Sequence, residues 1–237
     1  MALKSNLSDK YISYRKDIIE SKLDTMGVYP LDIMVAGVTG AGKSTTLNTF
    51  FQKDVAKVGD GVDPETMNIN SYKLSDHFRI WDTPGLGDGV IRDQQHKKSM
   101  IDLLYRKYRY HRDNKEYALI DMCLVIIEGS NRDMGTTYTL LNDVIVPNIQ
   151  SNRILVAINQ ADVAMKGRHW NSHTSSPDNV LLSYLNEQAL SVKRRVKEAT
   201  GVNIEKPICY SAKYDWNVDA VFDMIIDNIP SKRRAFI

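Results

Sequence analysis

The stretch "AGVTGAGKSTTLN", from Ala36 to Asn48, decides the fold. It contains the pattern G-x-x-x-x-G-K-S between Gly37 and Ser44. An apolar run, Asp32–Ala36, comes before the pattern and a helical stretch follows it, which is the context that a phosphate-binding loop requires. Glycines let backbone N–H groups turn toward phosphate oxygens, and the start of a helix adds partial positive charge. The stretch therefore predicts a phosphate cradle between a strand and a helix.

Short strand-like runs alternate with longer helical stretches along the rest of the chain. The expected strands are Asp32–Ala36, Asn68–Leu74, Phe78–Asp82, Met122–Ile127, Ile154–Asn159 and Pro207–Tyr210. The expected helices are Lys43–Gln52, Gln94–Tyr110, Thr136–Asp143, Asn179–Ala199 and Val218–Asn228. Four of the strands are almost wholly apolar, as in strands covered on both faces, and residues 68–82 are expected to form an antiparallel hairpin. The alternation predicts an α/β domain with a largely parallel sheet.

Composition and length are those of a single soluble domain with additions. The chain has 237 residues, 43% hydrophobic and 25% charged, and its net charge of +2 does not indicate a binder of polyanions. Cys123 and Cys209 lie in apolar runs and are expected to be buried, reduced thiols. The N-terminus lacks the apolar segment of a secretion signal, and the longest uncharged apolar run, Met122–Ile127, is too short to cross a bilayer. We therefore expect a cytoplasmic protein.

Three parts are expected along the chain: an N-terminal helical extension at 1–30, a nucleotide-binding domain at 31–230 and a short basic tail at 231–237. Apolar residues in the first part recur at roughly helical spacing, which favours an amphipathic helix packed on the domain. A membrane-surface or partner-binding helix is the alternative. The tail is expected to be disordered.

Two segments are expected to handle the phosphates. Lys43 should reach the β and γ phosphates, and the Ser44 hydroxyl should bind Mg²⁺. In "WDTPGLGD" Asp82 ends a strand and can hold Mg²⁺ through water, while the Gly85 N–H can bind a γ phosphate. The other residues of the cradle expected to contact the nucleotide are Gly40, Ala41, Gly42 and Thr45.

Two further segments are expected to recognise the base. "INQAD" ends at Asp162, whose carboxylate can accept hydrogen bonds from the guanine N1 and N2 groups. Adenine lacks this pair of donors and would leave the buried carboxylate unpaired, so Asp162 should select guanine. "YSAK" ends the last strand, where the Ala212 N–H could meet the guanine O6. The other base-motif residues expected at the site are Asn159, Gln160, Ser211 and Lys213. Their order and strand-end positions suit the carboxyl edge of an open α/β sheet.

Together these motifs resemble those of the translation-factor-related GTPases, in the Era-like and septin-like branch of the Ras-type G domain. Small bacterial Era-like proteins described as ribosome-binding GTPases are especially similar. The resemblance covers about Leu31–Pro230, the expected G domain. It implies a Ras-like fold with three α/β/α layers and a six-stranded, mostly parallel sheet that holds one antiparallel strand. It also implies GTP, GDP and Mg²⁺ binding, slow hydrolysis and two switch segments, with Thr66 as the switch I threonine that binds Mg²⁺.

Three positions depart from the family pattern. Leu86 stands where Ras-type enzymes carry a water-orienting glutamine, and leucine can neither orient nor polarise water. Hydrolysis should then depend on Mg²⁺, Lys43 and a group from a partner. Gln160 replaces the usual lysine of the base motif. Gly40 stands where potassium-activated relatives carry asparagine, which argues against that route to fast turnover.

Three functions remain open at this stage. The leading one is a GTPase that hydrolyses GTP slowly and acts as a nucleotide-dependent switch toward a protein effector. The alternative is a binding module with negligible hydrolysis that assembles as a GTP-dependent homodimer. Association with ribosome or RNA ranks lower.

Two other stretches carry weaker signals. The segment Arg92–Lys115 holds eight basic and three acidic residues with interleaved tyrosines, and a solvated helix is favoured over an RNA-facing surface. His169 and His173 are favoured as loop residues over metal ligands, because no third ligand lies near them in the sequence.

Overall fold

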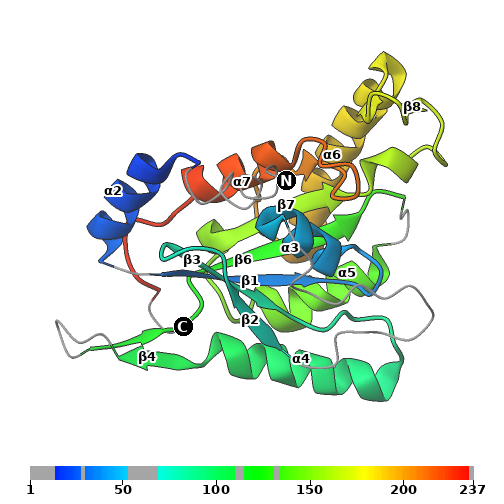
Figure 1. Cartoon of the computed structure of the whole chain (residues 1–237). Coiled ribbons are helices and arrows are strands. Elements are labelled where there is room, and N and C mark those ends of the chain that lie inside the picture. Colours follow the sequence, from blue (N-terminus) through cyan, green and yellow to red (C-terminus); the bar gives the residue numbers. More distant parts are fainter. Residues whose placement is uncertain (1–13, 28–29, 53–68, 110–114, 131–133, 235–237) are drawn as a thin grey trace, which may run out of the picture.

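The computed structural model describes residues 14–27, 30–52, 69–109, 115–130 and 134–234 (Figure 1). Its centre is a six-stranded sheet in the order β10-β7-β6-β1-β3-β2. The strands are β1 Leu31–Gly37, β2 Asn70–Lys73, β3 Phe78–Asp82, β6 Met122–Glu128, β7 Ile154–Asn159 and β10 Ile208–Cys209. All neighbours pair in parallel except β2 and β3, which form the antiparallel hairpin expected from the sequence. The predicted fold class is confirmed.

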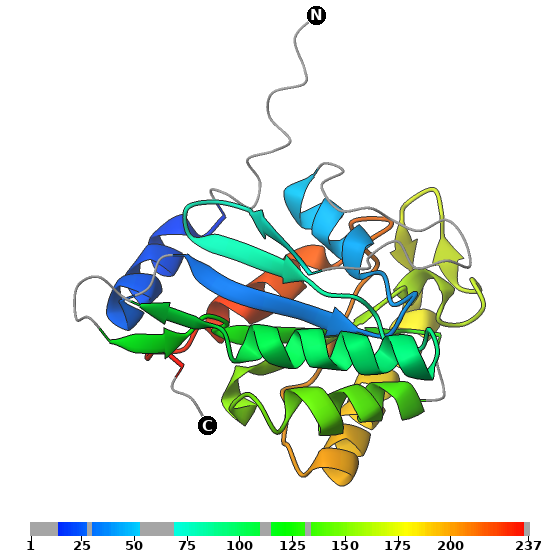
Figure 2. The ribbon, with the colours of Figure 1, turned by 90° about the horizontal axis from the view of Figure 1, so that it is seen from below.

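Helices cover both faces of this sheet, which is why its central strands are almost wholly apolar (Figures 1 and 2). One apolar cluster joins one face to α2 Lys16–Met26, α3 Lys43–Phe51 and α7 Val218–Asp227. The other cluster joins the opposite face to α4 Val90–Leu104, α5 Gly135–Leu140 and α6 Asn179–Thr200. A π-helical turn, Leu141–Ile145, continues α5. The protein therefore has the three layers expected of this fold.

The segment after α4 differs from its prediction. A helix was expected over 94–110, but α4 begins at Val90 and ends at Leu104. The chain then forms β4 Lys107–Arg109, which pairs antiparallel with β5 Glu116–Ala118. The Leu119 N–H also donates to the Arg106 carbonyl at 2.8 Å. The chain at β5 therefore supplies the backbone hydrogen-bond partners that residues 106–109 would have had in a longer helix.

The first described helix packs against the last one. Ile19 and Leu23 of α2 are buried, and the rings of Tyr14 and Phe222 lie 6.1 Å apart. The Arg15 guanidinium forms ion pairs of 2.7 Å with two aspartates of α7, Asp223 and Asp227. In the described residues, α2 thus packs beside α7 in the helical layer on one face of the sheet.

The C-terminal segment was expected to be disordered, and for residues 231–234 this expectation is wrong. Arg234 is only 1% exposed, and its guanidinium donates to the carbonyls of Asn148 and Leu104. The Ala118 N–H in turn donates to the Arg234 carbonyl at 3.3 Å. The segment is ordered because a buried arginine satisfies carbonyls at the end of α4 and in the turn after α5.

Two smaller expectations have clear outcomes. Cys123 and Cys209 are both buried and free, as predicted. Among the described helices, none combines the length and the apolar character that a bilayer span needs.

Candidate nucleotide site

Four loops meet beyond the carboxyl ends of the parallel strands. They follow β1, β3, β7 and β10, and they carry the four motifs identified in the sequence. Three side-chain hydrogen bonds join them: Ser44 Oγ to Asp82 Oδ2 at 3.4 Å, Asn159 Nδ2 to the Ala41 carbonyl at 3.0 Å, and Ser211 Oγ to Asp162 Oδ1 at 2.6 Å. Residues more than 100 positions apart therefore form one site at the edge where open α/β sheets bind ligands.

The loop after β1 has the backbone geometry of a cradle. Gly40 and Gly42 have φ angles of 82° and 83°, which non-glycine residues rarely adopt. A Cβ atom on Gly42 would lie 2.2 Å from Asn159 Nδ2, so the close approach of the two loops also requires glycine there.

Lys43 begins α3 and lies inside this loop. Its side chain is nearly buried, and its ammonium donates to the carbonyls of Gly37 at 3.2 Å and Val38 at 3.0 Å. Burial lowers the pKa of Lys43 to about 8, against the opposing effect of the carboxylates of Asp82 and Asp88. A desolvated cation whose described hydrogen-bond acceptors are two neutral carbonyls is suited to gaining an anionic partner.

Asp82 is the buried carboxylate of the site. Burial raises its pKa to about 6, while Lys43 and Ser44 oppose the shift. Its Oδ1 atom has no hydrogen-bond partner among the described residues, and its Oδ2 faces the Ser44 hydroxyl. An unpartnered carboxylate oxygen beside a hydroxyl is the oxygen-only donor set that Mg²⁺ prefers, so these residues fit the metal that the motif implies.

The "TPGLGD" segment lies directly on the cradle. The Thr39 N–H donates to the Leu86 carbonyl at 2.8 Å, and the Thr39 hydroxyl donates to Asp88 at 3.0 Å. A Cβ atom on Gly85 would lie 2.5 Å from the Thr39 nitrogen, so only glycine allows this contact. The Leu86 side chain is 0% exposed and packs in the apolar cluster under the sheet.

His96, a residue of α4 that no sequence motif singled out, contacts the "TPGLGD" segment. Its ring is buried in α4, and Nδ1 lies 2.8 Å from the Gly85 carbonyl. Since a carbonyl only accepts, Nδ1 carries the proton and Gly85 is held in place. A lone histidine on a helix gives no sequence signal for such a contact.

Asn159 links the cradle to the loop after β10. Its Nδ2 donates to the Ala41 carbonyl, and its Oδ1 accepts the Ala212 N–H at 3.0 Å. This N–H was expected to face guanine O6; in the structure its partner is Asn159 Oδ1. Gln160 donates to the Gly40 carbonyl at 2.7 Å, so the residue that replaces the usual lysine still spans to the cradle.

Asp162 is 7% exposed and has one oriented oxygen. Ser211 fixes Oδ1, which leaves Oδ2 for another donor. Lys213 lies over the Tyr214 ring at 5.1 Å. Thr45 lies in the first turn of α3, and Thr66 falls outside the described residues.

The weaker sequence signals have structural explanations. In the basic segment, Lys97 pairs with Asp143, and both Lys107 and Arg109 pair with Glu116. His169 Nδ1 lies 2.8 Å from Asp178, and the described residues contain no cluster of three metal-ligating side chains.

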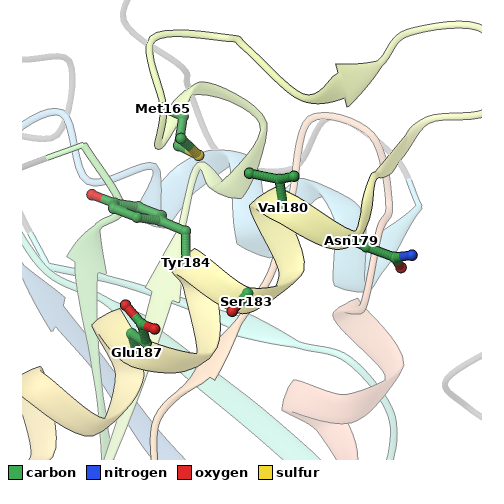
Figure 3. Close-up of a pocket in the computed structure, with 6 residues that line it drawn as sticks. All are labelled: Met165, Asn179, Val180, Ser183, Tyr184 and Glu187. Atoms are coloured by element: carbon green, nitrogen blue, oxygen red, sulfur yellow. The ribbon is translucent and has the colours of Figure 1, made fainter.

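A separate open cavity of about 510 Å³ lies on the first turns of α6 (Figure 3). It contains none of the predicted site residues; its lining consists of Met165, Asn179, Val180, Ser183, Tyr184 and Glu187. It is therefore distinct from the motif loops.

Comparison with known proteins finds a matching family and several relatives. Residues 32–192 match the family described as "50S ribosome-binding GTPase". YfjP of Escherichia coli, an uncharacterized protein, is 24% identical over 219 residues, which are 90% of this chain and 67% of YfjP. A probable GTP-binding protein EngB of Lactococcus lactis is 25% identical over 61% of this chain and 68% of its own length.

Two solved structures show the same fold at low sequence identity. Toc33 from Arabidopsis thaliana, bound to GDP and Mg²⁺, has a TM-score of 0.58 and 16% identity over 95% of this chain and 98% of Toc33. Era, bound to MgGDPNP and a segment of 16S ribosomal RNA, has a TM-score of 0.56 and 14% identity. That match covers 86% of this chain but only 58% of Era.

Proposed function

Because the chain belongs to the 50S ribosome-binding GTPase family, we propose that it binds GTP with Mg²⁺, hydrolyses it slowly to GDP and phosphate, and acts as a nucleotide-dependent switch. One observation carries the proposal: the four motif loops meet at one sheet edge, where a buried lysine and an unpartnered carboxylate oxygen lie beside the Ser44 hydroxyl. The buried lysine suits the phosphates of a magnesium–nucleotide complex, and the carboxylate and hydroxyl oxygens suit its metal ion.

The cradle and the loop after β3 form the phosphate end of the site. Lys43 exchanges its carbonyl contacts for the β and γ phosphates, and the cradle backbone from Gly40 to Thr45 binds the remaining phosphate oxygens. Ser44 and, through water, Asp82 hold Mg²⁺, together with Thr66. When bound, the metal offsets the phosphate charge. The Gly85 N–H binds the γ phosphate, and His96 holds Gly85 in position from behind.

The base end rests on the two loops after β7 and β10. Asp162, oriented by Ser211, accepts the guanine N1 and N2 donors. Asn159 keeps the Ala212 loop beside the cradle. The Ala212 N–H exchanges its bond to Asn159 Oδ1 for guanine O6 when the base binds. The aliphatic parts of Gln160 and Lys213 flank the base plane.

The burial of Leu86 supports slow hydrolysis. A side chain that is 0% exposed inside an apolar cluster cannot approach the attacking water. Unaided Ras-type G domains turn over at on the order of 10⁻⁴ per second even with their glutamine. We expect basal turnover below about one per minute, with the missing group supplied by a second surface.

One observation favours nucleotide-dependent assembly as a second candidate. Val90 and Ile91, at the start of α4, are 76% and 75% exposed. They directly follow the segment that contacts the cradle, so they lie next to the part of the chain that a γ phosphate would touch. Adjacent apolar residues at such a position suit a contact with a second copy or an effector. Association with ribosome or RNA is supported only by the names of the family and its relatives.

A titration with a fluorescent GTP analogue tests the proposal. The native protein should bind, and Lys43→Ala should lower the affinity on the order of 100-fold or more, because it removes the cation at the β and γ phosphates. Lys197→Ala, at an exposed position of α6, is the matched control and should bind normally. Unchanged affinity in folded Lys43→Ala would refute the cradle assignment.

Turnover measured over a range of protein concentrations, with size analysis in GDP and in a GTP analogue, separates the two candidates. Slow turnover that rises with concentration or with a partner is expected for the switch. Negligible hydrolysis with a GTP-dependent dimer would favour assembly. Fast turnover that stays constant per molecule at nanomolar protein would contradict both.

A further inference from the structure

The segment between Asp162 and α6, which reads as an irregular loop in the sequence, forms a small hairpin. Strands β8 Trp170–Asn171 and β9 Ser176–Pro177 pair antiparallel. The base of the hairpin is closed because the Asp178 N–H donates to the His169 carbonyl at 2.9 Å and the two side chains pair at 2.8 Å. Asp178 also caps α6 by accepting the N–H groups of Val180 and Leu181. The hairpin is therefore fixed to the start of α6.

Trp170 of this hairpin packs on the loop that follows β10. Its ring lies 5.2 Å from the ring of Tyr214 and 5.8 Å from that of Trp216, with an edge-to-face angle of 90° to the latter. These are favourable aromatic geometries. The indole Nε1 has no hydrogen-bond partner in the described part of the chain, so the ring is held by packing and not by a hydrogen bond of its N–H.

The loop that Trp170 contacts also positions the carboxylate of Asp162, the residue proposed to recognise the base. Ser211 and Trp216 exchange two backbone hydrogen bonds, each of 3.0 Å, which close the loop. Ser211 Oγ then fixes Asp162 Oδ1 at 2.6 Å. Within the loop, Asp215 and Asn217 have φ angles of 50° and 58°, in the left-handed region that aspartate and asparagine adopt more readily than other non-glycine residues.

We propose that Trp170 is a positioning residue for guanine recognition: through Tyr214 and Trp216 it holds the 211–217 loop so that Ser211 orients Asp162. The hairpin then contributes to the base site through Trp170. This inference rests on the proposed function, because it concerns the same nucleotide site.

The experiment compares Trp170→Ala, Trp170→Phe and a matched control, Tyr14→Ala, which removes an aromatic contact on α7 instead. Three quantities are measured: the Kd for GDP, the ratio of GDP to IDP affinity, and kcat and KM for GTP. IDP lacks the 2-amino group from which the Asp162 carboxylate would accept a hydrogen bond. The ratio of GDP to IDP affinity therefore reports on the Asp162 carboxylate.

Trp170→Ala should weaken GDP binding and raise KM by about three- to tenfold, with kcat unchanged, and should lower the GDP-to-IDP ratio. Trp170→Phe should restore most of the affinity, because the ring contacts need no indole N–H. Tyr14→Ala should leave the affinity and the ratio unchanged. Tyr214→Leu is the milder variant if Trp170→Ala does not fold, and it should shift the same three quantities.

Several results would overturn the inference. Native affinity and an unchanged ratio in folded Trp170→Ala would do so while leaving the proposed function intact. An equal loss in Trp170→Phe or in Tyr14→Ala would show that a general loss of stability, not the hairpin contact, is responsible. Failure of the native protein to bind GDP would instead remove the proposed function together with this inference.

Discussion

Leu86 directly follows Gly85, whose N–H would face the γ phosphate, and its side chain is buried in an apolar cluster. Leu86→Gln would place an amide in an apolar cluster, at a cost of about 1–3 kcal/mol when it lacks partners. We therefore expect no gain in GTP turnover and a lower midpoint in urea unfolding. A matched control is Leu182→Gln, on an exposed part of α6, which should leave the midpoint unchanged. A rise in turnover would mean that residue 86 reaches the water after all.

Asp162 should determine which base is bound. Asp162→Asn should weaken guanine nucleotides and favour xanthine nucleotides, because the xanthine C2 carbonyl accepts an amide N–H. The preference for guanine over adenine should also erode by orders of magnitude. Competition of GTP, XTP and ATP for a fluorescent analogue measures both effects. Equal affinity of the native protein for ATP and GTP would contradict the guanine assignment.

The residues predicted from the sequence were those whose partners follow from a local motif. Lys43, Ser44 and Asp82 sit at fixed spacing after strands, and the structure does bring them together. His96 and Trp170 were not singled out, because their contacts depend on how separate segments fold back on the motif loops. Thr66 remains a prediction.

At the scale of elements, long and strongly patterned segments were predictable and short pairings were not. The sequence placed α6 within one residue at its C-terminal end, because Gly201 adopts the left-handed conformation that ends a helix. The prediction joined α4 and β4 into one helix over 94–110, because the basic and tyrosine-rich segment has no turn signal at Tyr105. The pairing of β4 with β5 is decided by tertiary contacts instead.

The amino-terminal ends of β1 and β6 hold a buried acidic pair with a pH-dependent consequence. Asp121 Oδ2 accepts the Asp32 N–H at 3.1 Å, and Asp32 itself binds Arg79 and Trp81. Burial raises the pKa of Asp121 to about 7, and the nearby Asp32 charge adds to the shift, while the hydrogen bond from the Asp32 N–H and the charge of Arg153 oppose it. The ordinary pKa of an unfolded aspartate is about 3.9.

Between about pH 4 and pH 7 the folded state therefore holds a proton that the unfolded state has released. The free energy of unfolding should fall as the pH rises through this window, by about 1.4 kcal/mol per pH unit from this one group, and level off above it. Asp121→Asn should remove this slope, while Asp102→Asn, at an exposed position of α4, should keep it. Urea unfolding at several pH values measures both; an unchanged slope in Asp121→Asn would contradict the assignment.

At the scale of the whole molecule, the C-terminal segment closes the domain opposite the nucleotide edge. Arg153 donates to the carbonyls of Asp121 and Lys232, and Arg234 donates to those of Leu104 and Asn148. These bonds join α4, the start of β6 and the turn after α5 to the last described residues. The segment is thus a structural part of the domain.

Arg234→Ala should lower stability because it leaves buried carbonyls without a donor, at about 1–3 kcal/mol for each group that water cannot reach. Arg194→Ala, at an exposed position of α6, is the matched control and should change the free energy of unfolding little. Denaturant unfolding of both variants measures the difference. Equal stability of the two would show that the carbonyls find other partners.

The packing of α2 on α7 has a consequence for synthesis. Arg15 and Asp223 are 208 residues apart, so the first helix leaves the ribosome long before its partner exists. At about 5–20 residues per second, the wait is roughly ten to forty seconds. During that time the apolar face of α2, with Ile19 and Leu23, lacks the α7 residues of its native cluster. The nascent chain therefore exposes this face to chaperones or to aggregation until α7 has been synthesised.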